Sequence, residues 1–202
     1  QLERSLGIPQ QAFLALNVAF AEEHDAWAFP MVDAAANVTG VRLRNEKGEK
    51  WAVRGGKNGV FLPNYKAAQQ AYICEGPTDT AALLSIGLFA IGRPSCNEGA
   101  AILSELLPRL GVRTAVIVGD HDADKERPDG TTYNPGVDGS VRLSDALPVP
   151  TCVWIPPTKD AREFVQRGGT CAAVEEFTKG ARWNRPKARP LPPPAPASRR
   201  NS

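Results

Sequence analysis

The sequence contains no long hydrophobic run. None of its apolar stretches approaches the roughly 20 residues of a membrane-spanning helix. The first residues, from Gln1 to Ser5, carry charge and lack an apolar signal core. We therefore expect no membrane segment and no secretory peptide, and the cytoplasm is the expected location.

Cysteine and histidine are scarce, with four Cys and two His in 202 residues. No two Cys form a C-x-x-C pair, and neither His24 nor His121 is near a Cys in the sequence, so a structural zinc site is not expected. Cys74 and Cys152 lie in apolar runs, where a thiol usually behaves as a small hydrophobic side chain. We expect reduced cysteines and no disulfide.

Aromatic residues make up only 7% of the chain, but the hydrophobic fraction of 42% is enough for a globular core. The composition excludes a collagen, a coiled-coil rod and a wholly disordered chain. The length fits one domain of average size with a small addition.

Charge is unevenly distributed along the chain. Seven Lys and Arg lie from Lys179 onward without any acid, which leaves residues 1–178 with 17 cations against 22 acids. Within that acidic part there is a basic segment with Arg42, Arg44, Lys47, Lys50, Arg54 and Lys57. An acidic segment contains Asp120, Asp122, Asp124, Glu126, Asp129 and Asp138. Separate acids and bases suit a protein that binds a polyanion through metal ions, although solvated loops explain the clustering equally well.

The chain divides into three predicted segments. Residues 1–63 are expected to form a small α+β subdomain, with a helix over 9–20 and strands over 26–32, 38–44 and 51–53. Residues 64–180 are expected to form an α/β domain. Residues 181–202 are rich in Pro and Arg and predict a disordered linker, beyond which we expect another domain.

Residues 71–178 alternate between strand and helix patterns. The predicted strands are 71–74, 88–91, 114–118 and 151–155. The predicted helices are 77–86, 138–147, one from Asp160, and one to about Leu110 that a Ser95–Glu98 capping box would open. This alternation favours a parallel sheet covered by helices on both faces.

Acidic residues follow three of these strands. Glu75 ends the first, Asp120 and Asp122 follow the third, and Asp160 follows the last. Ligands of parallel sheets bind beyond the carboxyl ends of the strands, and an extended Asp-x-Asp points both carboxylates the same way. Carboxylates crowded in one crevice repel each other unless a cation lies between them, and an all-oxygen set favours Mg²⁺ or Mn²⁺. His121 should point away from the two Asp and is not expected to be a ligand.

The same residues resemble a known family. Glu75-Gly76-x-x-Asp79, Asp120-x-Asp122 and Lys159-Asp160 are similar to the motifs of the Toprim domain, which bacterial primases, topoisomerases and certain nucleases share. The basic stretch from Arg54 to Phe61 and the turn from Gly92 to Ser95 resemble the catalytic core of bacterial, phage and plasmid DNA primases. The likeness covers about residues 38–178 and departs at 124–135, an apparent insertion. The primase zinc-binding module is absent.

The resemblance implies synthesis of RNA primers on single-stranded DNA from NTPs, beside a replicative helicase. It implies that Asp120 and Asp122 hold the metals, with Asp160 as a further ligand. Glu75 would be a ligand or a general base, and Asp79 would orient the loop. Arg54 and Lys57 would contact phosphates or template. Arg42 and Arg44 are weaker candidates because a solvated strand face explains them equally well.

Three other functions remain open. A Toprim nuclease would use the same acids to direct water onto a phosphodiester. A degenerate Toprim would serve only as a docking module, which the insertion motivates and the intact acids oppose. An aspartate phospho-acceptor fold also places acids at strand ends, but the order of the motifs here does not favour it. The topoisomerase branch lacks a suitable context for a nucleophilic Tyr.

Overall fold

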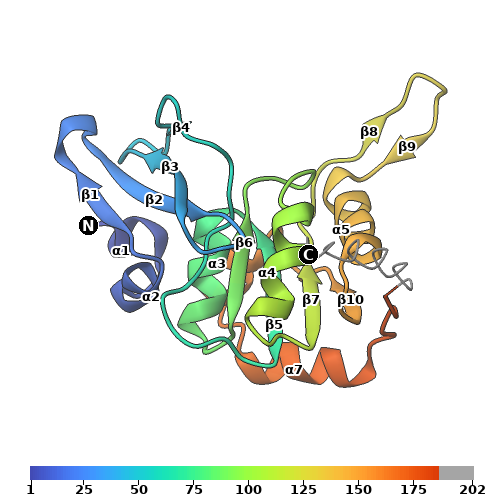
Figure 1. Ribbon diagram of the computed structural model, residues 1–202. Coiled ribbons are helices and arrows are strands. Elements are labelled where there is room, and N and C mark those ends of the chain that lie inside the picture. Colours follow the sequence, from blue (N-terminus) through green and yellow to red (C-terminus); the bar gives the residue numbers. More distant parts are fainter. Residues whose placement is uncertain (187–202) are drawn as a thin grey trace, which may run out of the picture.

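The computed structural model describes residues 1–186 and contains two main sheets with helices around the second (Figure 1). The remaining residues of the predicted linker, 187–202, lie outside the described part. Among the described residues, no helix combines the length and the apolar character that crossing a membrane requires.

The first sheet is antiparallel and has the strand order β1-β2-β3-β4. Its strands are β1 (Ala19–Ala21), β2 (Ala26–Val32), β3 (Val38–Arg44) and β4 (Lys50–Ala52). The helices α1 (Leu2–Leu6) and α2 (Gln10–Ala15) precede it, and a 3₁₀ turn, η1 (Glu22–His24), separates β1 from β2.

The predicted helix over residues 9–20 is wrong in its second half. The chain leaves helical geometry after Ala15, and Asn17 has a left-handed φ of 54°. Phe20 then pairs with Trp27 in the antiparallel sheet, where the two rings stack edge to face at 5.2 Å. Pairing with a strand that follows later in the chain therefore overrides the local helical pattern.

The second sheet is parallel and has the order β10-β7-β5-β6. Its strands are β5 (Gln70–Glu75), β6 (Ala90–Arg93), β7 (Thr114–Val118) and β10 (Thr151–Trp154). The helices around it are α3 (Gly76–Ser85), α4 (Ala100–Arg109), α5 (Pro135–Ala146), α6 (Ala161–Gln166) and α7 (Cys171–Gly180). The prediction of an α/β fold with a helix-flanked parallel sheet after a small α+β unit is confirmed.

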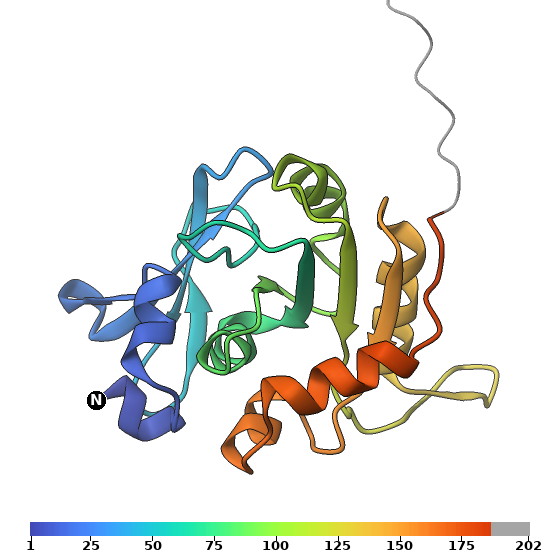
Figure 2. The same cartoon turned by 90° about the horizontal axis from the view of Figure 1, so that it is seen from below.

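The two faces of the parallel sheet carry separate apolar clusters, as side chains alternating along each strand require. On one face, Tyr72 and Val116 pack with α3, α6 and α7. On the other, Ile73 and Ile117 pack with α4 and α5. The first cluster also includes Phe13 and Phe29, so the N-terminal unit and the parallel sheet share one core beside α3 (Figures 1 and 2).

Three local predictions are corrected. Ser95 and Glu98 hydrogen-bond to each other within a turn, but α4 begins only at Ala100 after Gly99, whose left-handed φ of 90° separates the turn from the helix. The polar loop predicted after Asp122 contains a hairpin, β8 (Lys125–Glu126) and β9 (Thr132–Tyr133), which projects from the molecule (Figure 1). The first residues of the predicted linker also pack, because Asn184 forms a backbone bridge with Thr151.

Phe29 tests the shared core, since it is 1% exposed and meets Phe13 edge to face at 6.5 Å. We expect Phe29→Ala to lower the free energy of unfolding by about 3–5 kcal/mol in urea titrations, because it leaves a cavity in the apolar cluster that also contains Ala81 and Leu83 of α3. Phe20→Ala is the matched control, because Phe20 is 42% exposed and its loss should cost far less. Equal losses in the two variants would contradict a shared core.

Candidate functional site

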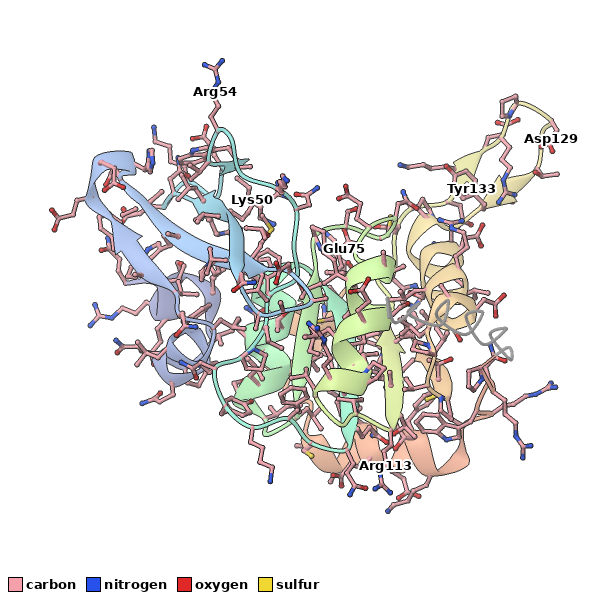
Figure 3. All side chains as sticks on the ribbon, viewed as in Figure 1. Lys50, Arg54, Glu75, Arg113, Asp129 and Tyr133 are labelled. Atoms are coloured by element: carbon pink, nitrogen blue, oxygen red, sulfur yellow. The ribbon has the colours of Figure 1, made fainter. Side chains whose placement is uncertain are left out.

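Glu75 and Asp120 lie at the same edge of the parallel sheet. Strands β5 and β7 are parallel neighbours in the register Ile73 to Ile117, and both acids follow within three residues of that pair. Glu75 ends β5 and stands at the N-cap of α3, while Asp120 follows Gly119 after β7. Figure 3 shows Glu75 at the upper edge of the sheet.

The backbone around Asp120 is tightly held. A Cβ at Gly136 would lie 2.3 Å from the Asp120 carbonyl oxygen, so α5 begins in direct contact with the loop after β7. The Gly119 amide donates to Trp154 O at 3.0 Å, and the His121 amide donates to Lys159 O at 2.8 Å. These contacts fix the position of Asp120, and the His121 side chain is exposed.

Asp120 has a larger pKa shift than Asp79. Its pKa is raised to about 8, first by burial and then by the charges of Asp79, Glu75, Asp160 and Asp122. Its buried Oδ1 has no hydrogen-bond partner in the described structure. The five predicted acids therefore act on one another at this edge of the sheet.

Asp79 and Asp160 are already hydrogen-bonded. Asp160 caps α6 by accepting from the Glu163 amide at 2.7 Å, and its other oxygen lies 3.4 Å from Arg162. Asp79, within α3, accepts from the Arg162 amide at 3.0 Å. Burial and the charge of Asp160 raise the pKa of Asp79 to about 6. Asp79 thus joins α3 to α6 and Asp160 caps α6, whereas Asp120 Oδ1 has no partner among the described residues.

The acids fit in part the divalent cation that the sequence predicts. Among residues 1–186, no three Asp, Glu, His or Cys side chains are close enough to form a finished coordination sphere. The unpartnered Asp120 Oδ1 and the mutual repulsion of the carboxylates do fit a hard cation with oxygen ligands. Glu75, Asp120 and Asp122 are the residues that could hold it.

Arg93 is a site residue that the sequence analysis missed. It ends β6 in register with Glu75 and is 1% exposed. Its Nη1 donates to Cys96 O at 2.7 Å, while its buried Nε has no partner. Burial raises the pKa of Glu75. The positive charge of Arg93 opposes this shift, whereas the negative charge of Asp122 adds to it. A charged residue ending the otherwise apolar run Ala90–Arg93 is the signal that could have identified it.

The basic residues of β3 and β4 face the acids. Arg42 pairs with Phe29, and Arg44 pairs with both Trp27 and Lys50, so these cations share the face that Phe29 buries toward α3. The pKa of Lys50 is lowered by desolvation and by the charge of Arg44, and Asp79 opposes this. Lys50 was not among the predicted site residues, although it lies closer to the acids than the loop that follows it.

Arg54 and Lys57 lie in that loop, after β4, and both are exposed. Figure 3 shows Arg54 at the outer tip, pointing away from Glu75. Neighbouring Asn58 donates to Glu98 at 2.9 Å, which ties the loop to the turn after β6.

A pocket of about 1280 Å³ lies elsewhere. Its walls are residues of α1, the segment after it, Trp27 and the β3–β4 turn. It contains none of the acids at the strand ends. The chemistry therefore points to the edge of the sheet as the functional site, whatever the size of this groove.

Comparison with solved structures gives the fold. The chain superimposes on the Aquifex aeolicus primase, zinc-binding and RNA polymerase domains, with a TM-score of 0.67 and 14% identity over 91% of this chain and 55% of that one. The bacteriophage T7 primase–helicase primase fragment gives 0.61 and 14% over 86% and 71%. A DnaG primase catalytic domain bound to single-stranded DNA gives 0.62 and 12% over 90% and 70%.

The chain therefore has the fold of bacterial and phage primase catalytic cores. It spans about half of the Aquifex structure. No family model and no curated protein matches the sequence.

The pKa of Asp120 predicts the pH dependence of stability in the metal-free protein. Its folded value of about 8 exceeds the ordinary 3.8, so the native state binds the proton more tightly and stability falls as pH rises from about 4 to about 8. In EDTA, Asp120→Asn should melt at a higher temperature than the wild type at pH 8, with a difference that shrinks toward pH 4. Glu105→Gln, on the exposed side of α4, serves as the control. A difference in melting temperature between wild type and Asp120→Asn that does not change between pH 4 and pH 8 would contradict the raised pKa of Asp120.

Proposed function

We propose that this chain synthesises RNA primers by metal-dependent nucleotidyl transfer on single-stranded DNA. The observation that carries the proposal is Asp120, a largely buried carboxylate without a partner for one oxygen, beside Glu75 at the edge of a primase-like sheet. A protein gains nothing in stability from such a group, which is typical of sites that bind charge.

In the proposed reaction, a ribonucleotide 3′-hydroxyl attacks the α-phosphate of the next NTP, and pyrophosphate leaves. Mg²⁺ or Mn²⁺ bound to Glu75, Asp120 and Asp122 would neutralise the charge on the phosphates. In its alternative role, Glu75 would accept the proton of the attacking hydroxyl instead of binding the metal, because burial raises its pKa above that of an ordinary carboxylate.

The remaining residues would position the reactants. Asp79 would hold α3 against α6 through the Arg162 amide, and Asp160 would cap α6 and be available as a further ligand. The cationic face of Arg42, Arg44 and Lys50 would attract the phosphates of the template or the NTP. Arg54 and Lys57 would contact the template farther out.

The comparison structures support the choice of partners. One of them is bound to single-stranded DNA, and another is part of a primase–helicase. We propose single-stranded DNA and NTPs as substrates and a replicative helicase as the neighbour. The proposed location is the cytoplasm, where both substrates are found.

Replacement of a single acid tests the proposal. We expect Asp122→Asn to reduce Mg²⁺- or Mn²⁺-dependent primer synthesis more than about 100-fold, since even residues that only support metal ligands contribute about 10- to 100-fold. Asp122 is exposed, so the fold should be unaffected. Asp124→Asn, in the same loop, is the matched control. Full activity of Asp122→Asn would reject the proposal, and cleavage of a labelled strand without synthesis would favour the nuclease.

Lys57 tests the proposed template contact. We expect Lys57→Ala to weaken binding of single-stranded DNA and to lower the slope of log affinity against log salt by about 1, because one phosphate contact is lost. Lys66→Ala is the control. Lys66 is exposed in the segment before β5, whereas Glu75 lies at the other end of that strand. An unchanged slope in Lys57→Ala would remove this residue from the template path.

A further inference from the structure

A second polar pocket lies beside the acids. It has a volume of about 460 Å³, which is in the range of sites for small ligands. Its walls come from the turn after β6, from the β8–β9 hairpin and from α5. The lining side chains that matter here are Cys96, Lys125, Arg127, Tyr133 and Arg142.

The hairpin wall is firmly built. Arg127 donates to Asp138 of α5 at 2.8 Å and lies over the Tyr133 ring at 4.4 Å. At the base, Asn134 donates from its side chain to Asp122 O at 2.5 Å and caps α5 by accepting from the Val137 amide. The hairpin is therefore held against α5 by Arg127 and by Asn134 at its base.

Positive charge dominates the pocket. Its lining contains three cations and one acid, Glu126. Arg127 is paired with Asp138, whereas Arg142 donates to the neutral amide of Asn97 at 2.8 Å, a bond that leaves its charge uncompensated. Lys125 of β8 and Arg142 of α5 thus provide two exposed cations from different elements around a space that suits one small anion.

The pocket borders the acids directly. Arg93, in register with Glu75, donates to the carbonyl of Cys96 in the pocket wall. Lys125 follows Asp122 by three residues, and Asn134 binds the Asp122 carbonyl. The charges of Glu75 and Asp122 also reach the Cys96 thiol, whose pKa they raise in addition to the effect of burial. An anion in this pocket would therefore have one end beside the proposed metal ligands.

We propose that this pocket binds the polyphosphate chain of a nucleoside triphosphate through Lys125 and Arg142. The inference rests on the proposed function, which supplies the nucleotide as substrate, and it gives the inserted hairpin a role in substrate binding. The compact volume favours one nucleotide over a strand of nucleic acid, which would need an extended basic track. The Tyr133 ring offers an aromatic edge to the same ligand.

Binding of ATP in EDTA, measured by isothermal titration calorimetry, separates this pocket from the metal site. We expect the double variant Lys125→Ala/Arg142→Ala to weaken ATP binding at least about 10-fold, because charge-assisted hydrogen bonds to phosphate are the strong ones. Arg113→Ala should bind like the wild type, since Arg113 is exposed at the opposite end of β7 (Figure 3). Circular dichroism would confirm that the folds are unchanged.

Asp122→Asn makes failure of this inference distinguishable from failure of the proposed function. This variant should lose primer synthesis but retain ATP binding in EDTA, because its pocket cations are intact. Wild-type ATP affinity in Lys125→Ala/Arg142→Ala would overturn the inference. It would also be overturned if that variant lost affinity only for a 12-nucleotide oligothymidylate, because the hairpin would then bind a strand.

Discussion

Repulsion among carboxylates at one edge of the parallel sheet is the constraint on which the site depends. Parallel strands bring Glu75 and Asp120 together through backbone register alone, before any side chain makes a contact. Asp79 and Asp160 offset their charge with amide hydrogen bonds, and Glu75 has the Arg93 guanidinium in register on β6. The buried Oδ1 of Asp120 has no hydrogen-bond partner among the described residues. The fold thus concentrates its electrostatic cost on one carboxylate, where a cation would relieve it.

The basic side chains on the face toward this edge belong to a different part of the chain. Arg42, Arg44 and Lys50 belong to the antiparallel sheet, and the apolar packing of Phe29 against α3 turns their face toward the acids. Because the two sheets share this core, the distance between bases and acids is set by close-packed side chains. The division at residue 63 remains a prediction, but the core continues across it.

Local patterns predicted much of this arrangement. The strand Thr114–Val118 was predicted with its correct bounds, because a β-branched run between polar turns has few alternatives. Glu75, Asp120 and Asp122 were found because acids directly after apolar strands are conspicuous, although their roles stay predictions. Arg93 and Lys50 were missed, since their importance comes from strand register between distant segments. The helix predicted over Phe20 is wrong for the same reason, because the strand pairing of Phe20 depends on Trp27, which follows later in the chain.

The excursion between Asp122 and Asn134 leaves and rejoins the fold at almost the same point. Asn134 closes it with bonds to the Asp122 carbonyl and to Asp124 Oδ1, and Gly136 then abuts Asp120. Once the ends of a loop are joined, its length adds only slowly to the entropy of closure. The arm can therefore differ in length at little cost in stability while Asp120 and Asp122 beneath it keep their backbone positions.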